Sequence, residues 1–221
     1  MRVLGVDGWK DRWLAVVCDD GTASAVVAAD ALADLARAYP EAVAIVVDVP
    51  IGLPVAGRRA ADVAARRFVG RRASSVFATP PRPVLEAATY RAALALSRTR
   101  YGVGVSAQGF ALRAKVLEAH RLDDDRILEG HPEVTFAALK GASLGFAKRT
   151  WNGQMERRRL LAEAGLEIPD VLGDDVGRAP ADDVLDAAAM AWSAGRAAAG
   201  AAATLPDPPE EIAGRRVAIW Y

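Results

Sequence analysis

Apolar and polar positions fall into short blocks near the N-terminus, and these blocks have the length of β-strands. The pattern predicts strands over residues 2–7, 12–18 and 22–28, and a fourth, apolar throughout, over 43–48. Asp19-Asp20-Gly21 is a turn signal between two β-rich runs, so the first three strands are expected to form an antiparallel meander. A strand that is apolar at every position is typical of a sheet covered on both faces.

Helical spacing of apolar positions dominates after residue 55. A short helix is also expected after Asp30, between the third and fourth strands. The longer predicted helices cover residues 59–69, 84–98, 107–120, 153–164 and 182–199, with an irregular stretch over 70–83. A fifth strand is predicted over 126–130, and residues 216–221 are strand-like. The pattern predicts an α/β fold with a mixed five-stranded sheet flanked by helices and a helical insertion after strand four.

Length and composition favour one domain. The chain has 221 residues, of which 52% are hydrophobic, enough for a single buried core spanning residues 1–221, with the helical insertion at about 55–122. Cys18 is the only cysteine, which excludes an internal disulfide and a cysteine-rich zinc site. No N-terminal signal is visible and no apolar run reaches the roughly 20 residues of a membrane span, so a cytoplasmic protein with no membrane partner is expected.

Aspartates at the ends of apolar strands are the main chemical feature. Asp7 and Asp48 each end such a strand, and if the two strands are parallel neighbours both carboxylates lie at one edge of the sheet. Asp183 and Asp186, spaced i and i+3, share a face of an alanine-rich helix. Carboxylates held together repel unless a cation or proton intervenes, and Mg²⁺ or Mn²⁺ suits oxygen ligands. The plainer alternatives are a turn residue at Asp7 and helix capping at Asp182 and Asp183.

Other residues have two interpretations each. Glu133, after a His-Pro pair, is either a further catalytic carboxylate or an acid in the first turn of a helix. His131 is either a proton shuttle or a histidine bonded to backbone. Lys115 is either a substrate-binding cation or the partner of Glu118 in a surface ion pair.

A basic segment offers candidates for substrate binding. Seven arginines and one acid, Asp62, lie between residues 57 and 82, although the net charge of the chain is zero. The candidates for holding phosphate oxygens are Arg71, Arg72, Ser74 and Ser75. The alternative is that these side chains solvate a loop and a helix face. Trp9 and Trp13 can stack on nucleic-acid bases, or they belong to the core.

Several ordered motifs carry a resemblance to a known family. They are Gly5-Val6-Asp7-Gly8, the run 48–54 (Asp-Val-Pro-Ile-Gly-Leu-Pro), 71–77, the helix with Ser106, Gln108, Lys115 and Glu118, the run 129–136, 182–187 and Ile219-Trp220-Tyr221. Together they resemble the domain of unknown function 429 family, labelled as predicted nucleases, and the resemblance implies a fold similar to ribonuclease H. Holliday-junction resolvases are similar in layout, with acids on strand one, on strand four and at the start of the last helix. Gly130 departs from the acidic-valine-His-Pro-Glu pattern usual there.

The leading hypothesis is a divalent-metal-dependent nuclease or phosphodiesterase, with a nucleic acid or a nucleotide as its partner. Asp7, Asp48, Asp183 and Asp186 would bind Mg²⁺ or Mn²⁺ and activate water. The alternative is a non-catalytic or small-ligand-binding protein on the same scaffold, which the even charge balance favours. A phosphotransferase of the actin and sugar-kinase type ranks last, because the chain is too short for two lobes. A homodimer is compatible with the sequence.

Overall fold

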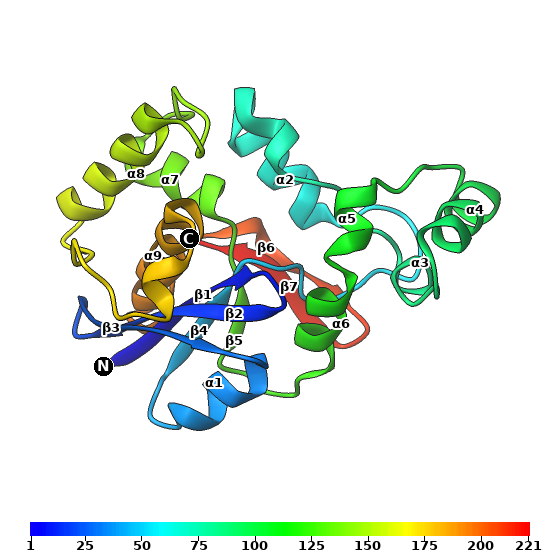
Figure 1. Ribbon diagram of the computed structural model, residues 1–221. Coiled ribbons are helices and arrows are strands. Elements are labelled where there is room, and N and C mark those ends of the chain that lie inside the picture. Colours follow the sequence, from blue (N-terminus) through cyan, green and yellow to red (C-terminus); the bar gives the residue numbers. More distant parts are fainter.

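A single mixed sheet of seven strands organises the molecule, in the computed structural model that describes residues 1–221 (Figure 1). Its order is β3-β2-β1-β4-β5-β7-β6. The strands are β1 (Arg2–Trp9), β2 (Arg12–Asp19), β3 (Thr22–Ala29), β4 (Ala44–Val47), β5 (Ile127–Glu129), β6 (Thr204–Ile212) and β7 (Arg215–Trp220). The first three form the predicted antiparallel meander, and β4 runs parallel to both β1 and β5.

Helices cover both faces of this sheet, as the apolar strands predict. They are α1 (Leu32–Ala38), α2 (Ala60–Phe68), α3 (Arg82–Leu85), α4 (Tyr90–Tyr101), α5 (Ala107–Ala111), α6 (Arg113–Arg121), α7 (Pro132–Lys140), α8 (Trp151–Glu163) and α9 (Ala181–Ala198), with the 3₁₀ turns η1 (Gly70–Ser75) and η2 (Val176–Arg178). One core lies between the sheet and α7, α8 and α9, and the other between the sheet, α1 and α6. In Figure 1, α3 and α4 project away from the sheet.

Small residues bring α9 into direct contact with the central strand. A Cβ on Gly5 of β1 would lie 1.8 Å from the backbone nitrogen of Ala191, so only glycine fits there. The facing residues Ala187 and Ala188 are fully buried. This close approach fixes the position of the first turns of α9 relative to the end of β1, which is where the predicted carboxylates lie.

The predicted count of five strands is wrong, because the sheet has seven. β7 matches the strand-like run at the C-terminus, whereas β6 carries no strand signal. Its prolines at 206, 208 and 209 oppose the prediction of a strand. β6 lies at the edge of the sheet and pairs only with β7, with an irregular register between Leu205 and Glu210, and an edge strand tolerates prolines.

The segment between β4 and β5 contains only helices and turns, as predicted. The predicted helix over 84–98 is interrupted, however. α3 ends at Leu85, and Thr89 begins α4 as a cap whose hydroxyl accepts a hydrogen bond from the Ala92 nitrogen at 3.2 Å. Ser106 is the predicted cap, accepting from the nitrogen of Gly109 at 3.0 Å, but the helix that follows is divided at Leu112 into α5 and α6. None of the helices combines the length and apolar character that a membrane crossing needs.

Candidate metal centre

Three aspartates converge at the carboxyl ends of β1 and β4. Asp7, Asp48 and Asp186 each offer one carboxylate oxygen, and these oxygens lie within 4.8 Å of one another. Asp7 is 8% exposed and Asp186 is 2% exposed, whereas Asp48 is half-buried. β1 and β4 are parallel neighbours, so their ends meet at one edge, and α9 supplies the third group. These three residues are called the acidic centre below.

Each aspartate is held by a different part of the fold. The Gly8 backbone nitrogen donates a hydrogen bond of 2.6 Å to Asp7 Oδ1. The Asp48 backbone nitrogen donates to the carbonyl of Val6 at 2.9 Å, which ties the end of β4 to β1. Asp186 lies in the second turn of α9, on the face that packs against β1. The three side chains are therefore positioned by the sheet and by the longest helix rather than by mobile loops.

The cation that forms an ion pair with the acidic centre is Lys148. Its Nζ lies 2.5 Å from Asp186 Oδ2 and 3.8 Å from Asp182 Oδ2, and it comes from the segment between α7 and α8. The other oxygen of Asp186, Oδ1, is buried and has no hydrogen-bond partner. A buried acceptor without a donor costs free energy, so the acidic centre has more acceptor capacity than the protein itself satisfies.

The electrostatics of the centre reflect this surplus of acid. Burial, together with Asp48 and Asp186, raises the pKa of Asp7 well above its ordinary range. Burial raises the pKa of Asp48, against the opposing influence of His131 and Lys148. Burial also raises the pKa of Asp186 to about 7, although Lys148 opposes the shift. Burial alone would lower the pKa of Lys148, but the nearby Asp186 carboxylate raises it above its ordinary value.

Two other acidic residues, at the start of α9, lie beside this centre. Asp183, predicted as a ligand, is half-buried and outside the group of three, and burial and Asp182 raise its pKa. Asp182 is buried in the first turn of the helix and lies 3.4 Å from Arg149 Nε and 3.8 Å from Lys148 Nζ. Asp182 is thus paired with cations, whereas Asp183 lies at the rim of the site.

Glu133 is buried and paired with an arginine. Its Oε1 accepts a hydrogen bond from Arg157, which is fully buried, while its Oε2 is buried without a partner. After burial, the charge of Glu133 adds to the rise in the pKa of the Asp48 carboxyl. His131 caps α7, because its Nδ1 accepts a hydrogen bond from the Glu133 nitrogen at 3.2 Å. The neutral ring therefore carries its proton on Nε2.

Lys115 approaches the centre from the other side, on α6. Its side chain packs on the backbone of Gly8, and its Nζ donates to the carbonyl of Arg12 and lies 4.3 Å from the centre of the Trp13 ring. Burial lowers the pKa of Lys115, while Glu118 and Asp7 oppose that change. Glu118 instead accepts hydrogen bonds from the Trp13 indole at 3.0 Å and the Leu32 nitrogen at 2.6 Å. The two residues do not form the surface ion pair that was the alternative interpretation.

The predicted phosphate-binding residues lie on η1. Arg71, Ser74 and Ser75 are exposed, and the Ser75 hydroxyl donates to the carbonyl of Arg72 at 2.7 Å. Arg72 is half-buried and its Nε lies 3.4 Å from the carbonyl of Leu144. η1 is therefore packed against the segment that carries Lys148, with Arg72 at the contact.

Sequence reasoning missed a buried network at the end of β5, the strand next to β4. Arg59, fully buried, lies with its Nη2 2.5 Å from Glu129 Oε2, and Glu129 also accepts from the nitrogen of Ile51 at 2.7 Å. Asp62 accepts from the nitrogen of Thr79 at 2.7 Å and from its hydroxyl at 3.2 Å. In the sequence, this network could have been found from Glu129, the acidic residue at the start of the 129–136 motif.

Two further expectations concern packing. Trp9 and Trp13 are 5% and 0% exposed, so they belong to the core and cannot stack on bases. Gly130 is required by packing, because a Cβ there would lie 2.4 Å from both Met190 Sδ and Val46 Cγ1. The departure from the usual motif at this position therefore accompanies the close packing of α9 on β4 and β5.

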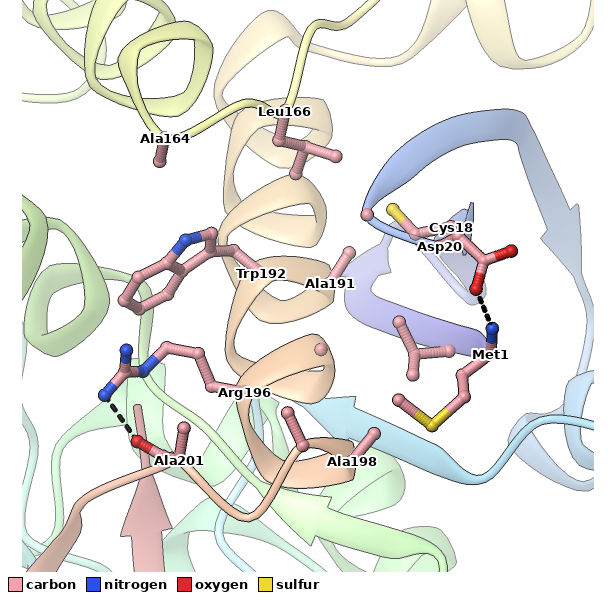
Figure 2. A pocket seen from close by; sticks show the side chains of 14 residues that line it. Met1, Cys18, Asp20, Ala164, Leu166, Ala191, Trp192, Arg196, Ala198 and Ala201 are labelled. Atoms are coloured by element: carbon pink, nitrogen blue, oxygen red, sulfur yellow. Dashed lines mark hydrogen bonds and ion pairs between the residues drawn. The ribbon is translucent and has the colours of Figure 1, made fainter.

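A separate pocket lies at the other end of β1, away from the acidic centre. It has a volume of about 310 Å³ and is lined mainly by apolar residues, with Met1, Cys18, Trp192 and Arg196 among them (Figure 2). The Arg196 guanidinium donates to the carbonyl of Ala201 at 2.5 Å and lies 4.9 Å from the centre of the Trp192 ring. No cluster of carboxylates lines this pocket, so it is distinct from the candidate metal centre.

Comparison with known proteins identifies the family of the chain. A search of curated proteins finds no match, and a search of solved structures finds none either. The family model described as "Protein of unknown function (DUF429)" matches residues 5–211, which include Asp7, Asp48 and Asp186. Since this match spans nearly the whole chain, the protein belongs to the DUF429 family.

Proposed function

We propose that this protein is a divalent-metal-dependent nuclease or related phosphodiesterase that uses Mg²⁺ or Mn²⁺ held by Asp7, Asp48 and Asp186. The observation that carries the proposal is the convergence of three carboxylate oxygens within 4.8 Å at a buried sheet edge. Ordinary structural aspartates are paired with donors, whereas this group receives one backbone N–H, on Asp7, and one ammonium, on Asp186, and leaves a buried oxygen of Asp186 unpartnered.

The donor set fits a hard divalent cation. All three ligands are carboxylate oxygens, which Mg²⁺ and Mn²⁺ prefer, and no cysteine lies among them. The unpartnered Oδ1 of Asp186 supplies acceptor capacity that such an ion would satisfy. A bound ion of this kind supplies Lewis-acid activation of water and neutralises charge at a phosphodiester.

The chain's own residues provide orientation and proton handling around the ion. The hydrogen bond from Gly8 fixes the Asp7 carboxylate, and the rigid α9 fixes that of Asp186. His131, with its proton on Nε2, can donate a hydrogen bond to an oxygen near Asp48 and so orient it. Lys115, next to Asp7, is the cation best placed to meet a phosphate oxygen from the α6 side.

The arrangement of acids also supports an RNase H-like core. Asp7 lies on strand one, Asp48 follows strand four, and Asp186 lies near the start of the last helix, which is the layout expected of Holliday-junction resolvases. We propose that β1 to β5 form that core and that β6 and β7 extend it at one edge. Asp183, at the rim, and Glu133, which is buried, would then complete the surroundings of the ion.

Metal binding and cleavage can be tested on the same preparations. Calorimetric titration with Mn²⁺ measures binding, and gel assays of labelled single- and double-stranded DNA and RNA measure cleavage. Asp7→Asn is expected to abolish metal-dependent cleavage while leaving the circular dichroism spectrum unchanged. Asp182→Asn is the matched control, since Asp182 lies on the same helix outside the group of three. Full cleavage activity in Asp7→Asn would reject the site.

A second candidate function is a non-catalytic or small-ligand-binding role on the same scaffold. The observation that favours it is Lys148, whose ammonium already partly neutralises the acidic centre. In that case Lys148 would be a permanent counterion and Mn²⁺ would not displace it. Absence of heat on Mn²⁺ titration, together with no hydrolysis of any nucleic acid, would favour this function.

A further inference from the structure

Two large aromatic side chains are exposed in the segment that carries Lys148. Trp151 is 73% exposed and Phe146 is 48% exposed. Both line an open hollow of about 590 Å³, whose wall also includes Arg72 and Asn152. The two rings share one hollow rather than being exposed singly, and exposed apolar side chains that gather in one place mark an interaction site. We call Phe146 and Trp151 the aromatic shelf.

The shelf is connected to the acidic centre through the chain between its two members. Lys148 lies between Phe146 and Trp151 in sequence, and its ammonium lies 2.5 Å from Asp186 Oδ2. Arg149, with an 86% exposed side chain, lies 3.4 Å from Asp182. A chain of phosphates that reaches Asp186 would therefore meet Lys148 and Arg149, which lie in the same short segment as the two rings.

The shelf is rigid rather than adaptable. Thr150 caps α8 by accepting from the nitrogen of Gly153 at 3.1 Å, and its hydroxyl donates to the carbonyl of Ala147 at 2.8 Å. A Cβ on Gly153 would lie 1.9 Å from that same carbonyl, so α8 and the loop pack backbone to backbone. The buried Arg157 donates to the carbonyl of Phe146 at 3.3 Å and also pairs with Glu133. A preformed surface binds without a large ordering cost.

Charge and shape together select the occupant. Arg72 lines the hollow together with the rings, and Arg149 lies two residues before Trp151 in the chain. Arginine forks match phosphate oxygens. An exposed indole can stack only on a base that is not already stacked within a duplex. We propose that the aromatic shelf binds a single-stranded segment of nucleic acid, with bases on Trp151 and Phe146 and phosphates on Arg72 and Arg149. This proposal takes its substrate class, a nucleic acid, from the proposed function. It adds that the substrate is single-stranded where it meets the shelf.

Binding can be measured separately from cleavage. The probes are fluorescein-labelled: a 12-nucleotide single-stranded DNA, an RNA of the same sequence, and the matching DNA duplex. Their binding is measured by fluorescence anisotropy. The protein carries Asp7→Asn and the buffer contains EDTA, so that no cleavage occurs. Single strands are expected to bind more tightly than the duplex. Trp151→Ala is expected to weaken single-strand binding by about tenfold, as loss of one stacked base does, and Trp151→Phe to retain most of it. A preference for RNA or DNA identifies which single strand is the ligand.

Matched controls test whether the effect is local. Met155→Ala changes a side chain that is 38% exposed on the same helix, and it should leave binding unchanged. Arg149→Ala should weaken binding and reduce the salt dependence by about one phosphate contact, whereas Arg159→Ala, on the same helix and paired with Glu163, should do neither. Equal binding of duplex and single strand, with no effect of Trp151→Ala, would overturn the proposal. The proposal would also be overturned if Trp151→Ala changed the sedimentation coefficient but left oligonucleotide binding unchanged, because the shelf would then be a contact with another protein chain.

The two proposals fail in different experiments. If the wild-type protein binds single strands through Trp151 but never cleaves with Mn²⁺, the proposed function is rejected and the shelf is retained. If the wild-type protein cleaves with Mn²⁺ and Trp151→Ala changes neither binding nor cleavage, the shelf is rejected and the metal centre is retained.

Discussion

Two buried groups of charged residues lie at the ends of neighbouring strands in this protein, and they differ in their supply of hydrogen-bond donors. In the group of Arg59, Asp62 and Glu129, called the Arg59 network here, the carboxylates accept from a guanidinium, a hydroxyl and two backbone nitrogens. In the acidic centre, Asp7 accepts from one backbone nitrogen and Asp186 from one ammonium. Both groups have more acids than cations, so the number of charges does not distinguish them.

The difference separates a structural role from a binding role. A buried carboxylate that receives hydrogen bonds from its own fold is stabilised without a ligand. A buried carboxylate without those donors takes up a proton or a cation, and Asp186, with one buried oxygen unpartnered, is of this second kind. The pKa does not separate the two groups, because burial raises the pKa of Glu129 to about 7 as it does that of Asp186. Each prediction below changes one group and asks whether the other responds.

Arg59→Met is expected to have the largest effect on stability. Removal of this fully buried cation leaves the Glu129 and Asp62 carboxylates buried without a counterion, which should cost about 3–5 kcal/mol in the free energy of unfolding. Urea unfolding followed by circular dichroism measures the loss, and adding Glu129→Gln should restore part of it. Mn²⁺ should not. A loss below about 1 kcal/mol would mean that the network is not structural.

Gly5→Ala is expected to disturb the acidic centre through the backbone. The new Cβ would lie 1.8 Å from the Ala191 nitrogen, so α9 must move away from β1 and take Asp186 with it. The free energy of unfolding should fall by about 2–3 kcal/mol, and the increase in melting temperature with Mn²⁺ should disappear. Gly195→Ala on the same helix, where nothing lies within 4 Å, should be neutral or stabilising. An unchanged Mn²⁺ response in Gly5→Ala would contradict the proposed position of α9.

Asp186→Asn is expected to stabilise the metal-free protein in a pH-dependent way. The folded pKa of Asp186 is about 7 against an ordinary 3.8, so between these pH values the folded wild type binds more protons than the unfolded chain. Stability of the wild type therefore falls as pH rises through that window, and asparagine does not share the loss.

The measurement is urea unfolding of both proteins in EDTA at several pH values. The advantage of Asp186→Asn over the wild type should grow by about 1–3 kcal/mol between about pH 4 and pH 7 and then level off. Saturating Mn²⁺ should remove this advantage and make the wild type the more stable of the two proteins. An advantage that shrinks as pH rises would show that the Lys148 pair stabilises ionised Asp186.

The convergence of acids was predictable because it depends on local patterns. Apolar strands ending in Asp7 and Asp48 define a sheet edge, and the alanines after Asp186 predict a helix that lies close to the sheet. Periodicity does not reveal which distant side chains supply countercharge. Lys148 comes from an irregular segment, and Arg59 was visible only as one of many arginines in a basic stretch. Trp151 opens a helix with little apolar periodicity, so its exposure could not be predicted either.

Lys148→Met is expected to have the smallest effect on stability and to test the acidic centre most directly. Lys148 is 37% exposed, and the carboxylates can take up protons in its absence, so the free energy of unfolding should change by less than about 1 kcal/mol. If the ammonium occupies the position that a metal ion takes, its removal should raise the affinity for Mn²⁺ by about tenfold, or about 1.4 kcal/mol. Calorimetry at pH 8 measures this affinity.

Lys140→Met is the matched control, because Lys140 lies at the end of the preceding helix and pairs with Glu156 instead. An Mn²⁺ affinity that stays the same in Lys148→Met would show that the ammonium does not compete with the ion. A higher affinity combined with lost cleavage would be more informative, because Lys148 would then have to leave Asp186 when the ion binds and meet the substrate phosphate beside the aromatic shelf. In that case the acidic centre would bind the ion because its own fold supplies too few donors, and ion binding would free Lys148 for the reaction. The Arg59 network, whose carboxylates receive donors from the fold, could not act in this way.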